Sequence, residues 1–114
     1  MTKFMCLFRS NPGVYRTMSP EQMQQMTQRW MEWKDALEKG GNLVQLGERL
    51  DASGKVVRGR EKTVTDGPFV EVKDSIQGYI VIQAEDLEQA VELAKGCPVL
   101  DRDGTVEIRP FHTT

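Results

Sequence analysis

The segment from Asp66 to Asp74 holds the highest density of chemically useful side chains in the chain. Asp66 opens an Asp-Gly-Pro corner, and its carboxylate could act as a general base or anchor the charge of a ligand. The same side chain could instead bond its own backbone in an Asx-type turn. Glu71 and Lys73 lie two residues apart, on one face of an extended chain. They form either the charged rim of a pocket or a solvated surface pair.

Two polar residues on later predicted strands complete the candidate site. The hydroxyl of Tyr79 needs a hydrogen-bond partner if it is buried, and Asp66 or Glu71 could supply one. Arg109 shares a strand face with Glu107, so it either pairs with that carboxylate or reaches a ligand. The candidate catalytic residue is Asp66, and the candidate ligand-binding residues are Glu71, Lys73, Tyr79 and Arg109.

The sequence predicts that the protein needs no metal and no cofactor. Its single histidine, His112, lies in the C-terminal tail, and Cys6 and Cys97 lack the spacing of a metal or redox motif. It also contains no glycine-rich phosphate loop and no nucleophile elbow. Any chemistry would therefore rest on acid–base side chains.

The 114 residues are enough for one domain, 1–114, with one core. The net charge is -2 and the basic residues are scattered, which argues against nucleic acid or an anionic membrane as a partner. The longest N-terminal apolar run, Phe4 to Phe8, is much shorter than a signal-peptide core or a membrane span. We therefore expect a cytoplasmic protein without a membrane partner.

Local patterns predict two helices. Ser19-Pro20-Glu21-Gln22 is typical of a capped helix start, and an apolar stripe at intervals of three and four follows as far as Leu37, before Lys39-Gly40-Gly41 ends the helix. Trp30 and Trp33 on this stripe either pack in the core or form a platform for a ligand. A second helix begins at the Asp86 cap, and its predicted stripe is Leu87, Ala90, Val91 and Ala94.

The predicted strands span residues 3–8, 43–50, 78–82 and 105–110, with a short extension over 56–60 and a segment 62–65 that leads into the Asp66-Gly67-Pro68 corner. The element order is therefore β-α-β-β-α-β with an extra central hairpin, which predicts an α+β, ferredoxin-like fold. Two helices can cover one face of a four-stranded sheet, yet Phe4–Phe8 and Tyr79–Ile82 are apolar on both faces. We expect a second copy of the chain to cover the other face, which makes the protein a homodimer.

The charged segment resembles the signature of the DGPF family within the YCII-related group, Asp-Gly-Pro-Phe-Ala-Glu-Thr-Lys-Glu. Here Val70, Val72 and Asp74 replace the alanine, threonine and last glutamate of that signature. The similarity extends along most of the chain. It includes the first apolar strand, Gly41, Gly78-Tyr79 with its aliphatic strand, Pro98, and the closing Val106–Pro110 segment.

The resemblance implies a dimeric α+β barrel. Members of the wider group place a helix His and an Asp in one cleft, and here Trp30 stands where that His would fall. The leading hypothesis is a small-molecule site in the cleft between sheet and helices. If the protein is an enzyme, we expect cofactor-free acid–base chemistry on a small organic ligand, such as an elimination or isomerisation, which would rest on Asp66. The alternative is a non-catalytic sensor or accessory protein that works with an extracytoplasmic-function sigma factor.

Overall fold

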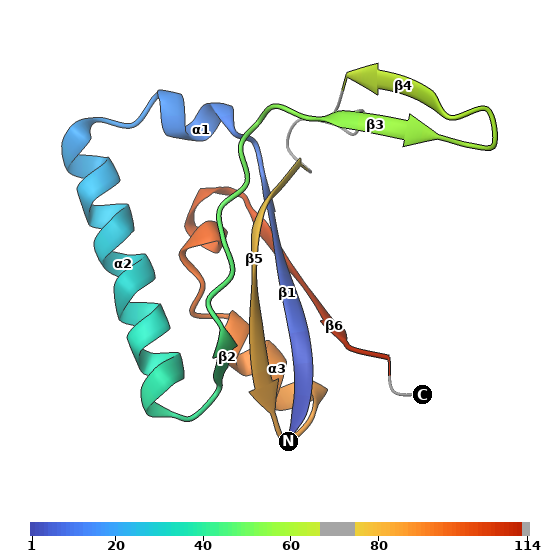
Figure 1. Ribbon diagram of the computed structural model, residues 1–114. Helices are drawn as coiled ribbons and strands as arrows, with labels where there is room; N and C mark the ends of the chain where they lie inside the picture. The colour runs from blue at the N-terminus through green and yellow to red at the C-terminus, as the bar shows by residue number, and fades with distance from the viewer. Residues whose placement is uncertain (67–74, 113–114) are drawn as a thin grey trace.

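The computed structural model of the protein describes residues 1–66 and 75–112 (Figure 1). The elements in chain order are β1 (Thr2–Ser10), α1 (Gly13–Arg16), α2 (Pro20–Lys39), β2 (Leu43–Gln45), β3 (Lys55–Arg58), β4 (Thr63–Asp66), β5 (Ser75–Ala84), α3 (Leu87–Ala94), the 3-10 helix η2 (Pro98–Arg102) and β6 (Thr105–Pro110).

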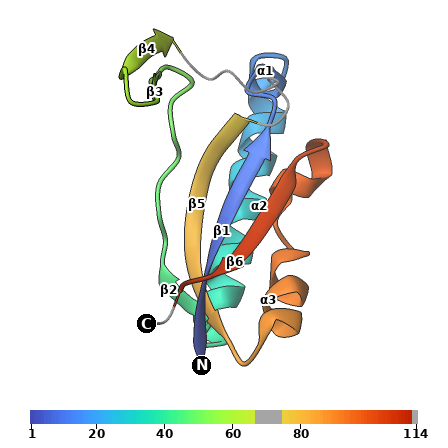
Figure 2. The ribbon, with the colours of Figure 1, turned by 90° about the vertical axis from the view of Figure 1, so that its right-hand side faces the viewer.

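Four of the strands form one antiparallel sheet in the order β2-β5-β1-β6. The helices α2 and α3 both lie behind this sheet in Figure 2, on the same face. The α+β prediction is therefore confirmed, and the strand order is compatible with a ferredoxin-like fold. We call the helix side of the sheet the covered face and the other side the open face.

Side chains of β1 alternate between these two faces, as the period of a strand requires. Phe4, Cys6 and Phe8 are buried on the covered face, where they meet Trp33 and Leu37 of α2 and Ile80 and Ile82 of β5 in one core cluster. Met5 and Leu7 point to the open face and are half-buried. The core thus lies between one face of the sheet and the two helices.

The start of α2 follows the sequence prediction. The Ser19 hydroxyl accepts a hydrogen bond from the Gln22 amide, and the Gln22 side chain accepts one from the Ser19 amide. This reciprocal capping box is confirmed, and it satisfies two N–H groups that the first turn leaves without partners. Asp86 caps α3 with a single bond, which its carboxylate accepts from the Gln89 amide.

The predicted stripe of α3 is wrong in part. Ala90 and Ala94 are buried, but Leu87 and Val91 are exposed, and Leu93 packs against the core instead. The helix therefore turns small side chains towards the sheet, which allows it to lie close to the strands.

The strand predicted over 43–50 is much shorter, because β2 ends at Gln45. Its register shifts between Leu43 and Gln45, and Gly47 has a φ of 71°, which breaks the strand. The chain meets β5 again only at an isolated bridge between Arg49 and Gly78. The short helices α1 and η2 were not predicted, since neither is long enough to show an apolar period.

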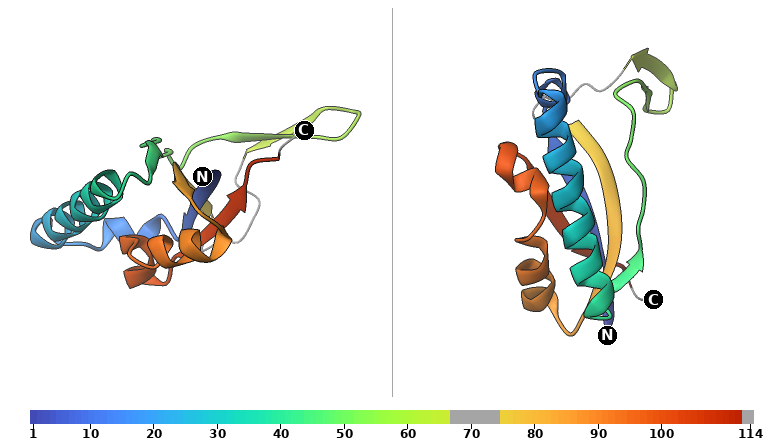
Figure 3. Two further views of the ribbon diagram at one scale, coloured as in Figure 1. Left: turned by 90° about the horizontal axis from the view of Figure 1, so that it is seen from below. Right: turned by 90° about the vertical axis from the view of Figure 1, so that its left-hand side faces the viewer.

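The strands β3 and β4 pair only with each other and form an arm that extends away from the helices (Figure 3). The radius of gyration is 15.6 Å, against about 13 Å for a compact chain of this length. The central hairpin of the prediction is therefore present but stands apart from the main sheet.

Candidate functional site

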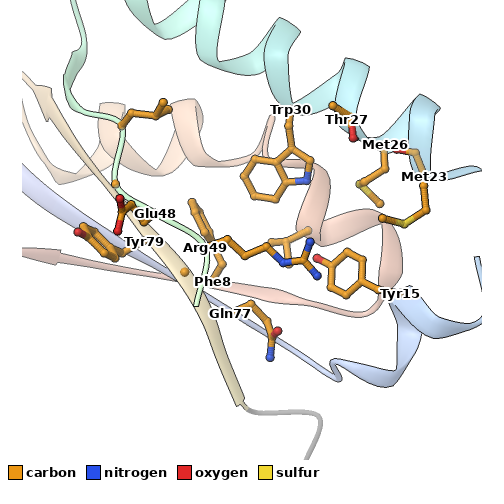
Figure 4. A pocket seen from close by; sticks show the side chains of 14 residues that line it. Phe8, Tyr15, Met23, Met26, Thr27, Trp30, Glu48, Arg49, Gln77 and Tyr79 are labelled. Carbon is orange, nitrogen blue, oxygen red and sulfur yellow. Dashed lines mark hydrogen bonds between the residues drawn. The ribbon is translucent and has the colours of Figure 1, made fainter. Parts of the chain in front are cut away.

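A cavity of about 310 Å³ lies on the covered face between α2 and β5 (Figure 4). We call it the α2–β5 pocket. Its lining residues are Phe8, Tyr15, Met23, Met26, Thr27, Trp30, Leu46, Gly47, Glu48, Arg49, Gln77, Gly78, Tyr79 and Val99.

Aromatic rings form one wall of the pocket. Phe8 and Trp30 meet edge to face with ring centroids 5.1 Å apart, and both contact Trp33 in the same geometry. The indole N–H of Trp33 donates to the Leu93 carbonyl at 2.9 Å, which holds this ring in the core. Edge-to-face contacts of this kind keep aromatic rings in one orientation, so the wall is formed before any ligand arrives.

Two glycines position the segment that closes the pocket. A Cβ at Gly47 would collide with the carbonyl oxygen of Tyr79, and one at Gly78 would lie 2.8 Å from the carbonyl oxygen of Glu48. The segment around Gly47 and strand β5 can therefore cross closely only because both positions lack a side chain. The Leu50 amide then donates to the Gln77 carbonyl at 2.7 Å. Backbone contacts on both sides thus hold the backbone of Arg49 in place.

Arg49 is the cationic residue of the pocket lining. Its guanidinium lies over the Tyr15 ring, 4.5 Å from the centroid, in a cation–π contact. Asp51 is the nearest acidic residue along the chain, but its carboxylate is bonded to the Ser53 hydroxyl at 2.6 Å. This bond, the backbone amides of Ala52 and Ser53 and, to a lesser degree, the charge of Arg49 lower the pKa of Asp51.

Asp66, the candidate catalytic residue, does not line the pocket. It ends β4 on the arm, where its carboxylate accepts a hydrogen bond from the Lys55 ammonium at 2.7 Å. Its side chain is 86% exposed, and charge interactions are weak in water at this exposure. Glu71 and Lys73 lie outside the described residues, as does Phe69 of the signature.

Tyr79 and Arg109 lie on the open face of the sheet. The backbone of Tyr79 borders the pocket, but its ring points away from Trp30 and Arg49 (Figure 4). The guanidinium of Arg109 lies 3.8 Å from the carboxylate of Glu107, and the same carboxylate lies 3.4 Å from Arg9. Of the candidates within the described residues, Asp66, Tyr79 and Arg109 are therefore not brought together, and among these three Tyr79 borders the pocket.

The sequence interpretation missed Tyr15 and Arg49. Asn11 accepts a hydrogen bond from the Gly13 amide at 2.8 Å and thereby starts the helix that carries Tyr15. The Asn11-Pro12-Gly13 turn and Gly47 are sequence signals of breaks in the chain before Tyr15 and Arg49. Neither signal indicates that these two side chains line one cavity. Trp30 was identified as either core or ligand platform; its ring packs against the core cluster and also lines the pocket.

The described residues contain no group of three His, Cys, Asp or Glu side chains that could hold a metal ion. Cys6 and Cys97 are buried free thiols. Burial raises the pKa of Cys6 to about 11 and is the main cause that raises the pKa of Cys97 to about 12. Such thiols remain protonated near neutral pH and are poor nucleophiles.

The fold and the helix–sheet cavity define a small α+β protein with a preformed pocket, and the family follows from comparison. The model of the YCII-related domain family matches residues 2–112, so the chain belongs to this family. A comparison with curated proteins gave no match. No helix in the described ranges is long and apolar enough to cross a membrane.

Proposed function

We propose that this protein binds a small organic molecule in the α2–β5 pocket. The observation that carries the proposal is the cavity itself, which has the size of small ligand sites, about 300–1,000 Å³. Its lining is mainly apolar and aromatic, with few polar groups. The pocket also contains Trp30, at the helix position where the resemblance places the His of the wider group.

Binding is better supported than proton transfer. Glu48 is the carboxylate of the described lining, and its side chain points away from Trp30 (Figure 4). Asp66 lies on the arm and is ion-paired with Lys55. A general base must come within hydrogen-bond reach of the proton that it removes, and neither carboxylate is turned into the pocket. A non-catalytic sensor, the alternative from the resemblance, needs the same pocket and no base.

The two tryptophans allow a direct test by ¹H–¹⁵N NMR. A small aromatic probe that enters the pocket should shift the indole N–H signal of Trp30 in a saturable way. The signal of Trp33 should stay in place, because its N–H is bonded to the Leu93 carbonyl. We expect this result with at least one of naphthalene-2-carboxylate, 2-naphthamide and 2-naphthylmethylamine.

A matched pair of variants shows whether the probe is in this cavity. Thr27 lines the pocket and Gln28, the next residue of α2, does not. Thr27→Phe should fill the cavity and abolish the Trp30 shift, while Gln28→Phe should leave it unchanged. Equal probe binding by both variants would place the ligand elsewhere, and no shift with any probe would overturn the proposal.

We also propose that a second copy of the chain covers the open face, as in a dimeric α+β barrel. Met5, Leu7 and Tyr79 give this face an apolar centre, and Glu107 and Arg109 lie at its margin. The arm extends away from the helices (Figure 3), so the described helices leave this face uncovered. A stable homodimer of this kind should bury on the order of 2,000 Å² or more.

Sedimentation tests the dimer. Wild type should sediment as a dimer at low micromolar concentration, and Leu7→Lys should sediment as a folded monomer, since a charge at the centre of the face cannot be buried without a partner. Thr105→Lys at the margin is the control and should leave the dimer intact. A wild-type monomer at that concentration would overturn this assembly.

A further inference from the structure

Three hydrogen-bond donors of the α2–β5 pocket converge on one part of the cavity. Figure 4 shows the Arg49 guanidinium, the Tyr15 hydroxyl and the indole nitrogen of Trp30 turned towards one another. They come from three separate segments, namely the bridge to Gly78, helix α1 and helix α2. A cluster of donors from separate elements suits an acceptor that arrives from outside.

None of the three donors is used by the described part of the protein. Arg49 contacts the face of Tyr15 but has no ion-pair partner there, and neither the Tyr15 hydroxyl nor the Trp30 N–H has a hydrogen-bond partner. The other polar groups of the lining are engaged locally. The Thr27 hydroxyl donates to the Met23 carbonyl, and the Gln77 amide donates to the carbonyls of Ser10 and Ser75.

The charges around the donors favour an anion. Arg16 lines a second, more open hollow that shares Tyr15 and Arg49 with the pocket, and Asp51 is the acid in that hollow. The Asp51 carboxylate is held by the Ser53 hydroxyl. Glu48 points away from Trp30 (Figure 4). A ligand anion at Arg49 would therefore meet the donors of Arg49, Tyr15 and Trp30 directly, with the ionised Asp51 as the carboxylate that it must displace from the charge of Arg49.

We infer that the ligand of this pocket is an organic monocarboxylate with a flat apolar body, whose carboxylate is bound by Arg49, Tyr15 and Trp30. The body lies against the Phe8 ring and the thioethers of Met23 and Met26, which line the same cavity. One guanidinium in a small pocket matches one carboxylate, since the planar guanidinium fork pairs with it through two parallel hydrogen bonds. This inference rests on the proposed binding function and specifies its ligand.

The three naphthalene probes test the charge of the ligand, because they share one apolar body. Naphthalene-2-carboxylate should bind about 10-fold or more tightly than 2-naphthamide, the value of a hydrogen bond to a charged group. 2-Naphthylmethylamine should bind more weakly still, because its cation meets Arg49. Dissociation constants come from titration of the Trp30 indole signal at pH 7.

Variants then assign the effect to the donors. Arg49→Met keeps the aliphatic stem and should weaken binding of the carboxylate by about 10- to 100-fold, but leave the amide unchanged. Arg109→Met is the matched control on the opposite face of the sheet and should change neither constant. Tyr15→Phe keeps the ring under Arg49 and should cost about 3- to 10-fold for the carboxylate. Thermal unfolding of each variant confirms that the fold is intact.

The outcomes separate this inference from the proposed function. Equal binding of all three probes, or a carboxylate constant that Arg49→Met does not change, would overturn the carboxylate class and leave the pocket standing. Absence of any Trp30 shift with every probe would overturn the binding function and the ligand class together.

Discussion

The two faces of the sheet differ although the same strands build both. On the covered face, Phe4, Cys6 and Phe8 are at most 7% exposed. On the open face the intervening residues of β1, Met5 and Leu7, are half-buried. The first surface is completed within the chain by α2 and α3, and the described residues leave the second without a covering layer. The comparison shows that the presence of an apolar residue on a strand does not by itself indicate whether the side chains that pack against it belong to the same chain.

The same comparison separates the candidate residues from the pocket. The pocket lies on the covered face, and at its rim the exposed Arg49 places its guanidinium over the Tyr15 ring. Tyr79 and Arg109 project from the open face, and Asp66 lies on the exposed arm. Of the candidate residues that the structure describes, Asp66 and Arg109 therefore lie away from the cavity, and the Tyr79 ring points away from it.

The largest expected contrast between the faces is in packing. Leu37→Ala removes a side chain that is 1% exposed and should lower the free energy of unfolding by about 2–5 kcal/mol. Leu7→Ala on the open face should cost about 1 kcal/mol in the monomer. Urea unfolding at several protein concentrations measures both. A Leu7→Ala cost that grows with concentration would show that a second copy covers the face, and equal costs in the monomer would contradict the comparison.

The second contrast is in proton binding. The thiols of Cys6 and Cys97 have pKa values raised from 9.0 to about 11 and about 12 by burial. Between the unfolded pKa of 9.0 and the folded pKa of each thiol, the folded protein binds more protons than the unfolded chain. The contribution of the protonated thiols to the free energy of unfolding is therefore fully present below pH 9 and is lost as the pH rises towards 11–12. Each thiol should lower stability by about 1.4 kcal/mol per pH unit in this window.

The measurement for the thiols is urea unfolding at pH 8 to 11. Cys97→Ala is less stable at every pH because of the cavity that it leaves, but its slope against pH above 9 should be shallower than that of wild type. Identical slopes, or fast labelling of either thiol at pH 8 in the folded protein, would show that the covered face is open to water.

The third contrast is a pair of substitutions of an aromatic residue by phenylalanine. Trp33→Phe removes the N–H that donates to the Leu93 carbonyl at 2.9 Å and leaves a gap beside the smaller ring, so it should lower the free energy of unfolding by about 1–3 kcal/mol. Tyr79→Phe on the open face removes a hydroxyl that has no partner among the described residues, and it should change the melting temperature little. The reverse ranking in thermal unfolding would place Tyr79 in a bonded network.

The smallest expected effect belongs to the arm. Asp66→Asn removes the charge of an exposed pair with Lys55 and should change stability by less than about 1 kcal/mol. Binding of naphthalene-2-carboxylate should be unchanged, because Asp66 does not line the pocket. A loss of about 100-fold in binding or turnover with the fold intact would restore Asp66 as a base or charge anchor.

Local patterns in the sequence determined the elements that local physics stabilises. The Ser19 capping box, the Asp86 cap and the stripe through Met26, Trp33 and Leu37 were all predicted correctly. Each depends on hydrogen bonds or spacings within a few residues, so the chain specifies them before it folds. The α+β order of elements followed from the same patterns, and the family followed from the resemblance of the charged segment to a known signature.

The tertiary structure alone decided where the pocket lies and which residues line it. Tyr15, Trp30 and Arg49 line one pocket because Gly47 and Gly78 allow two backbone segments to cross, and this crossing depends on a strand register that no local pattern specifies. Asp66 was placed on the arm by the pairing of β3 with β4. Residues far apart in sequence form a site only through the packing of the elements that carry them, and that packing is a property of the whole chain.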